Sequence, residues 1–112
     1  MNFKKIFISL LVLSFSAAAG AANKSNYKAA VENCSMLSEL AGSAFDARQN
    51  GVPISEMYKT LIGEQKEIRE VGRIIIDSAY RNKVEMTERR SKIAKSEYVD
   101  TFFKDCLHYL DK

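Results

Sequence analysis

The sequence of 112 residues has no tryptophan, one histidine, one proline and two cysteines. It has no glycine-rich phosphate loop and no CxxC motif, which argues against nucleotide chemistry and thiol-redox catalysis. The single histidine, His108, and the two cysteines do not supply the three or four converging ligands of a metal site. We therefore expect no metal, no cofactor and no enzymatic activity.

Long hydrophobic runs are also scarce. The one pronounced run, Ile6 to Phe15, spans ten residues, fewer than the roughly twenty that cross a bilayer as a helix. Lys4 and Lys5 precede it, and small residues from Ser16 to Ala22 follow it. This pattern is typical of a cleaved export signal, with an uncleaved membrane anchor as the alternative. We expect a signal peptide at 1–22 and a single domain at 23–112, located in the periplasm or secreted.

The expected mature domain, residues 23–112, has no large excess of either positive or negative charge. The whole chain carries a net charge of +3, but Lys4 and Lys5 leave with the signal, so 15 basic residues remain against 14 acidic ones. A nearly neutral domain gives no support for nucleic-acid binding, which usually requires a strongly basic surface.

Cys34 and Cys106 both lie in the mature part. An even cysteine count in a small exported domain predicts a disulfide, and two free thiols are the alternative. The bridge would enclose 71 residues and stabilise the fold by about 4 kcal/mol on the chain-entropy model.

The spacing of apolar residues predicts helices and no strands. The first helix begins near Ser25 or Asn26, ends at Asn50–Gly51, and has a buried face formed by Tyr27, Ala30, Val31, Cys34, Leu37, Ala41, Ala44 and Phe45. The last helix begins after Thr87, a suitable N-cap, and buries Val99, Phe102, Phe103, Cys106, Tyr109 and Leu110.

Between these helices, Pro53 breaks the chain and Ser55 can cap a new helix. We place a short helix at 55–62 and a longer one at 64–81, separated at Gly63; an uninterrupted helix through Gly63 is the alternative. Cys34 lies early in the first helix and Cys106 late in the last, so a bridge requires these helices to be antiparallel. The fold class is therefore an all-α antiparallel bundle of three to four helices, with one disulfide linking the first and last.

Two segments are candidates for binding. The stretch from Arg81 to Lys95 is rich in cations, four of them in the first turns of the last helix, where the helix dipole disfavours them. A solvated helix face with Glu85–Arg89 and Glu88–Lys92 pairs is the simpler interpretation. The candidate binding residues here are Arg81, Arg89, Arg90, Lys92 and Lys95.

The second candidate is the corner at 47–57, which contains Arg48. Its simpler interpretation is a helix stop, a turn and a cap, with Arg48 bonding the last carbonyls of its own helix and Tyr80 packing beneath.

The chain resembles a loose group of small exported helical proteins of proteobacteria through residues that occur in this order over most of 34–106: Cys34, Ala47, Arg48, Gly51, Pro53, Ser55, Met57, Ala79, Tyr80 and Cys106. This resemblance implies a periplasmic helical fold with a disulfide and no settled activity. The chain is also similar in size, signal and single disulfide to the Hde-type periplasmic acid-stress chaperones, but its cysteines are more widely spaced.

Together these features favour a non-catalytic protein-binding module whose partner is another envelope protein, such as an enzyme blocked by an inhibitor or immunity protein. The basic stretch could add a weak contact with an anionic membrane surface. The alternative function is a periplasmic stress chaperone that binds unfolded clients.

The first prediction concerns export. We expect the protein recovered from the periplasm or medium to begin between residues 20 and 23, because a peptidase can cut within the small residues from Ala19 to Ala22. Intact-mass measurement of the exported protein tests this, and an N-terminus at Met1 would contradict it.

Overall fold

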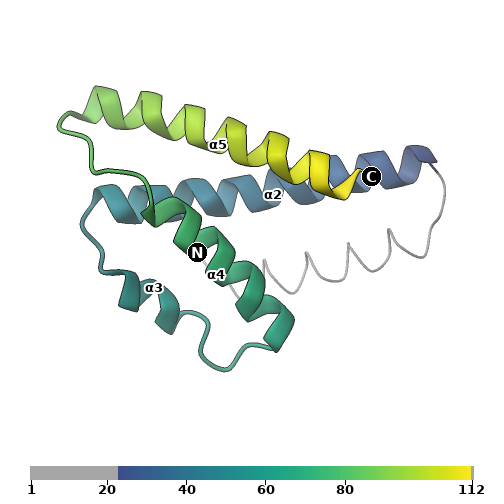
Figure 1. The fold of residues 1–112 in the computed structure, drawn as a ribbon, viewed down its shortest axis with the longest axis horizontal. Coiled ribbons are helices and arrows are strands. Elements are labelled where there is room, and N and C mark those ends of the chain that lie inside the picture. Colours follow the sequence, from purple (N-terminus) through teal and green to yellow (C-terminus); the bar gives the residue numbers. More distant parts are fainter. Residues whose placement is uncertain (1–22, 112) are drawn as a thin grey trace.

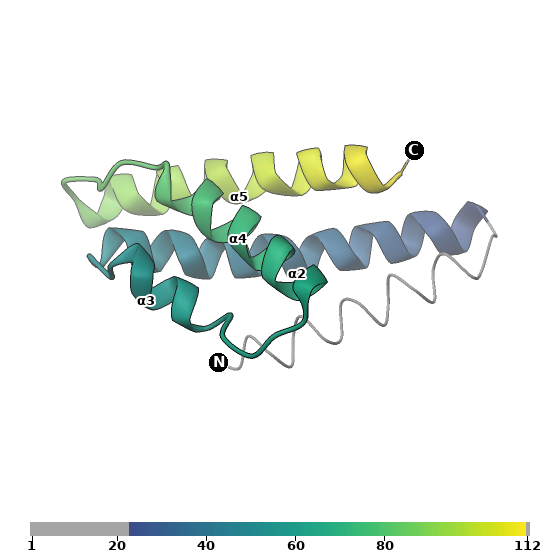
Figure 2. The same cartoon turned by 60° about the horizontal axis from the view of Figure 1, so that its bottom comes forward.

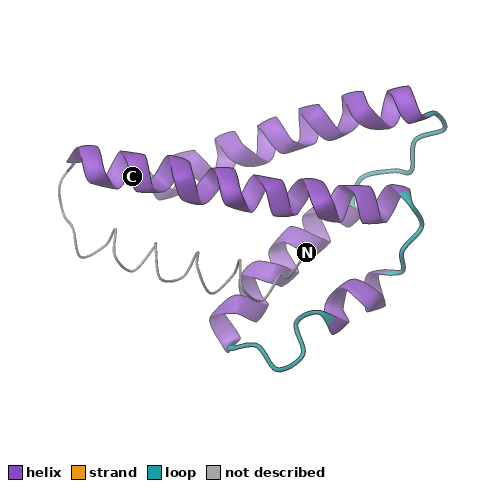
Figure 3. Cartoon of the chain, turned by 180° about the vertical axis from the view of Figure 1, so that it is seen from behind, coloured by secondary structure: helices purple, strands orange, loops and turns teal. Residues whose placement is uncertain are grey.

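The computed structural model describes residues 23–111, so the expected signal peptide lies outside the described residues. These residues form four helices, α2 (Asn23–Gln49), α3 (Ile54–Lys59), α4 (Lys66–Tyr80) and α5 (Glu88–Leu110), and no strand (Figure 3). The predicted all-α fold with four helical segments is confirmed.

The two long helices, α2 and α5, run side by side in opposite directions, and α4 packs obliquely across α2 (Figures 1 and 2). A disulfide joins Cys34 of α2 to Cys106 of α5, with a Cα–Cα distance of 5.7 Å. Both the predicted bridge and the antiparallel arrangement that it requires are confirmed. Packing occurs between α2 and α5, between α2 and α4, and between α3 and α4, so α2 is the central helix.

Two glycines lie in turns between helices, as the sequence indicates. Gly51 follows the end of α2 closely, whereas α3 already stops at Lys59, before the expected residue 62, and α4 begins at Lys66, after the expected residue 64. Gly51 has φ 77° and Gly63 has φ 85°, a left-handed conformation that side chains with a Cβ disfavour. The break at Gly63 is therefore real, and the alternative of one uninterrupted helix is wrong. Thr87 caps α5 by accepting a hydrogen bond from the Arg90 backbone N–H at 3.1 Å.

The expected cap at Ser55 is wrong, because α3 begins one residue earlier, at Ile54. Pro53 occupies its N-cap and no side chain caps the helix. Pro53 has φ −62°, which its ring fixes and which suits the start of a helix, so here the proline sets the boundary and no hydroxyl is required.

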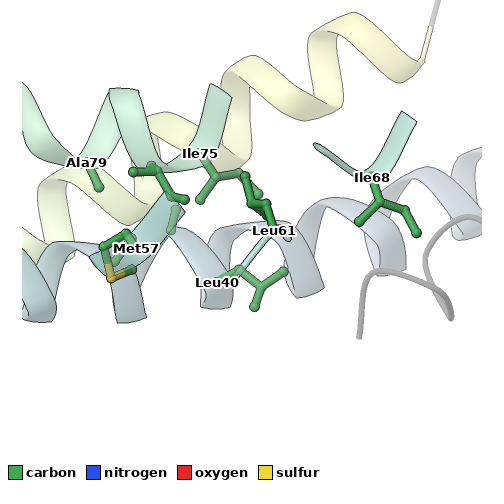
Figure 4. Packing of buried hydrophobic residues seen from close by; sticks show 9 residues of the cluster. Leu40, Met57, Leu61, Ile68, Ile75 and Ala79 are labelled. Carbon is green, nitrogen blue, oxygen red and sulfur yellow. The ribbon is translucent and has the colours of Figure 1, made fainter. Parts of the chain in front are cut away.

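The core lies where α3 and α4 meet α2 (Figure 4). Its buried members are Leu40, Ala41, Ala44, Met57, Leu61, Ile68, Ile75, Ile76 and Ala79. Leu40, which is only 1% exposed, was absent from the expected face of the first helix, because α2 is covered by α4 on one side and α5 on another. Gly72 allows the close approach of Leu61, since a Cβ there would lie 2.5 Å from Leu61 Cδ2.

The packing of α5 differs from the expectation. None of its residues is fully buried, and two members of its predicted buried face, Tyr109 and Leu110, are 72% and 42% exposed. One of its partly buried side chains, Tyr98, stacks on the buried Phe45 of α2 with ring centroids 5.7 Å apart. The apolar second half of α5 therefore faces α2 along a narrow stripe and leaves much of its surface uncovered.

The second prediction concerns the disulfide. Because α5 has so little buried surface, we expect Cys34→Ala to lower the free energy of unfolding by about 2–5 kcal/mol. Urea unfolding monitored by circular dichroism measures this loss. Treatment with a reductant should destabilise the wild type to a similar extent and leave the variant unchanged. Equal stability of the variant and the oxidised wild type would contradict the prediction.

Candidate functional site

A groove opens between α4 and the second half of α5, with α2 as its floor. Its volume is about 640 Å³. Asn33 and Leu37 of α2 lie at the floor, and Cys106 brings the disulfide into the α5 wall. We call this feature the α4–α5 groove.

The groove exists because α4 and α5 both pack on α2 while their axes diverge (Figure 1). At the closed end of this wedge, Tyr98 of α5 donates a hydrogen bond to Ser78 Oγ of α4 at 2.9 Å. Burial raises the pKa of Tyr98, and its bond to Ser78 opposes that shift. Tyr98 thus holds the wedge at one end, and the open end lies toward the C-terminus of α5.

The walls of the groove are mainly apolar, and several of their side chains are exposed. Ile74 is 64% exposed, Tyr109 72% and Leu110 42%. Within the Ile74–Ile75–Ile76 run, Ile75 and Ile76 are buried in the core. Ile74 points away from the core and lines the groove. Large apolar side chains that gather at a concave surface are typical of binding sites.

Charged groups lie at the margin of the groove: Asp77 of α4, Arg81 directly after the end of α4, and Asp105 of α5. Asp77 accepts a hydrogen bond from the Tyr58 hydroxyl of α3. That bond raises the pKa of Tyr58, because it stabilises the neutral phenol beside a carboxylate. The margin therefore combines two carboxylates with one guanidinium.

Some cations of the predicted basic stretch form ion pairs in the structure, and others do not. Lys95 forms an ion pair with Asp46 of α2 at 2.7 Å, and Lys92 pairs with Glu88 at 3.9 Å, as predicted. The Lys95 pair joins two helices, so this lysine contributes to the α2–α5 interface. Arg81, Arg89 and Arg90 are exposed, and no ion pair of theirs is recorded among residues 23–111.

The expected Glu85–Arg89 pair is replaced by another contact. Glu85 Oε2 lies 4.0 Å from Lys83 Nζ, and the Glu85 side chain is only 11% exposed. The side-chain Oε1 of Gln49 accepts a hydrogen bond from the Glu85 backbone N–H at 2.8 Å, and Gln49 Nε2 donates to the Lys83 carbonyl at 2.8 Å. One glutamine of α2 therefore fixes the turn between α4 and α5, which the sequence did not indicate.

Arg48 lies at a structural joint. Its Nε donates to the carbonyl of Asn82 at 3.0 Å, and its guanidinium lies 5.8 Å from the centre of the Tyr80 ring. Tyr80 in turn donates its hydroxyl to the Val52 carbonyl at 2.7 Å. Arg48 thus bonds the backbone just beyond the end of α4, whereas the sequence placed its bond on its own helix. The expected packing of Tyr80 beneath this corner is confirmed.

The third prediction tests whether Arg48 is structural. We expect Arg48→Ala to lower the free energy of unfolding by about 1–2 kcal/mol, because a charged donor to a partly buried carbonyl is lost. The exposed Arg90→Ala, used as a control, should stay within about 0.5 kcal/mol of the wild type. Chemical denaturation measures the free energy of unfolding of both variants. Equal values for Arg48→Ala and Arg90→Ala would show that Arg48 does not stabilise the joint.

The groove offers a broad apolar surface with a few polar groups at its margin, a combination that binds an apolar segment and orients it. In residues 23–111 no three or more His, Cys, Asp or Glu side chains lie close enough to hold a metal ion. None of the described helices is long and apolar enough to cross a membrane. No protein-family model, curated protein or solved structure matches this chain.

Proposed function

We propose that this chain is an exported, non-catalytic protein-binding module whose α4–α5 groove receives an amphipathic helix of a partner protein. The observation that carries this proposal is the presence of three exposed large apolar side chains, Ile74, Tyr109 and Leu110, at one groove of about 640 Å³. An amphipathic helix that lays its apolar face into such a groove is a recurrent mode of protein recognition.

The dimensions suit this occupant. The α4 wall from Ile68 to Ser78 extends roughly 15 Å along the helix axis, at about 1.5 Å per residue. Two to three turns of a partner helix fill that length. Asp77 and Asp105 at the margin favour a helix whose apolar face is flanked by Lys or Arg.

The biological role that we assign is that of an inhibitor or immunity protein acting on an enzyme of the cell envelope. A preformed groove walled by a disulfide lowers the entropic cost of ordering on binding. This feature supports one specific partner more than a range of unfolded clients.

The stress-chaperone alternative is supported by a different observation, the lack of any fully buried residue in α5. Detachment of α5 would uncover Phe45, which packs against Tyr98. A chaperone of this kind would act after α5 loosens, whereas the groove acts while α5 stays in place.

The fourth prediction tests the groove. We expect Ile74→Glu to weaken capture of the partner at least about tenfold, because a carboxylate would be buried in place of an apolar side chain. Ile62→Glu is a matched control, because Ile62 is 69% exposed and lies outside the groove. The immobilised mature domain is incubated with periplasmic extract, and bound proteins are quantified by mass spectrometry.

Wild type and Ile62→Glu should retain one protein in near-stoichiometric amount. If Ile74→Glu retains it equally well, the groove is not the binding site. If the wild type instead suppresses aggregation of several unrelated proteins, the chaperone function is correct.

A further inference from the structure

The connection between α4 and α5 carries a surface of mixed composition that the groove does not explain. We call residues 81–93 the basic tip. It contains five cations, Arg81, Lys83, Arg89, Arg90 and Lys92, and two anions, Glu85 and Glu88, a net charge of +3. It also displays Met86 at 93% exposure, Val84 at 50% and Ile93 at 52%.

This exposure arises on a defined turn. Gln49 bonds the backbone at Lys83 and Glu85 on either side of Val84, and the Thr87 cap follows Met86 directly. An anchored position therefore lies on each side of Val84 and on each side of Met86. A methionine displayed in this way buries nothing within its own chain.

The charges of the basic tip are arranged unevenly. The Glu85 side chain turns inward and is only 11% exposed, next to Lys83. Glu88 is engaged by Lys92 at 3.9 Å. Glu88 and Lys92 are both exposed and offset one another, while Arg89 and Arg90 are also exposed, so the outward-facing charge of the tip is net positive.

The basic tip lies far from the α5 end of the groove. The α4–α5 connection and the start of α5 lie at one end of the elongated molecule, whose extents are 46 × 31 × 20 Å (Figure 1). Arg89 and Tyr109 are separated by roughly 30 Å along α5 at 1.5 Å per residue. A flat surface can therefore meet the tip while the α5 end of the groove stays clear of it.

We propose that the basic tip docks on an anionic lipid surface, with Met86 and Val84 entering the interface and Arg89 and Arg90 contacting the headgroups. Long basic side chains extend their charged ends to headgroups while their stems lie along apolar surface. Anionic membranes attract such clusters, and apolar insertion adds a second contribution. An acidic protein surface with an apolar pocket is the competing occupant, because Met and Arg are also enriched in protein interfaces, and the experiment below distinguishes it from a lipid surface.

The attachment should be weak and reversible, because the apolar contribution comes from one methionine and part of a valine. Stable anchoring to a membrane generally takes two contributions. Binding to the lipid surface therefore needs both the positive charge and the apolar insertion, and removal of either should weaken it measurably.

The fifth prediction uses the oxidised mature domain and vesicles of phosphatidylglycerol mixed with phosphatidylcholine, compared with phosphatidylcholine alone. We expect cosedimentation only with the anionic vesicles, and a decrease as NaCl rises from about 0.05 to 0.5 M, because salt screens the charges. Arg89→Glu/Arg90→Glu should weaken vesicle binding at least about tenfold, since each cation near the surface contributes to the affinity. Met86→Ser should weaken binding about threefold or more, since one apolar insertion is lost.

A matched control is Lys66→Glu/Lys104→Glu, which changes the net charge equally at exposed positions outside the basic tip. It should bind vesicles like the wild type, and circular dichroism should show that both double variants remain folded. An equal loss of vesicle binding by the control variant would show that the effect comes from the net charge of the domain alone, and would overturn the proposal. Absence of vesicle binding by the wild type, or capture of an acidic protein that depends on Arg89 and Arg90, would also overturn it.

Discussion

The position of α5 depends on one covalent bond, and much of the molecule depends on the position of α5. This helix has no fully buried residue, so hydrophobic burial alone holds it weakly against α2. The disulfide from Cys34, which is 0% exposed, fixes its second half. The first half is held by the Asp46–Lys95 ion pair and by Tyr98 stacked on Phe45. An exposed ion pair contributes little by itself, which leaves the covalent bond as the main constraint.

The same arrangement explains why a groove is present. A fully packed bundle would bring α5 against α4 along its length and would bury Tyr109 and Leu110. Here the bridge ties α5 to α2 and not to α4, while Tyr98 and Ser78 join α4 and α5 at one point. The wedge stays open beyond that point, and the apolar residues of its walls remain available. The apolar content that a small domain usually needs for its core is thus partly displayed at a concave surface.

The sequence was informative where one local rule decides the structure. Gly51 and Gly63 marked turns between helices, Thr87 capped α5, and the cysteine positions required antiparallel first and last helices. The cap expected at Ser55 was the exception, because Pro53 sets that boundary. It failed where packing among three helices decides. Helical spacing assigned Tyr109 and Leu110 to a buried face, but nothing local reveals that α4 diverges from that face. The groove and the links made by Arg48 and Gln49 depend on tertiary arrangement. The sequence signs of the groove were the apolar residues in the second half of α5 and the Ile74–Ile75–Ile76 run of α4.

The groove and the basic tip meet at Arg81, which lines the groove and is also one of the five cations of the tip. A partner helix that places a carboxylate near Arg81 would neutralise that cation and weaken the attraction to anionic lipid. A partner with basic flanks, which Asp77 and Asp105 favour, would leave Arg81 free to act at the membrane. The charge pattern of the groove margin therefore suits a partner that binds while the tip is docked, with α5 holding the open end of the groove away from the lipid surface.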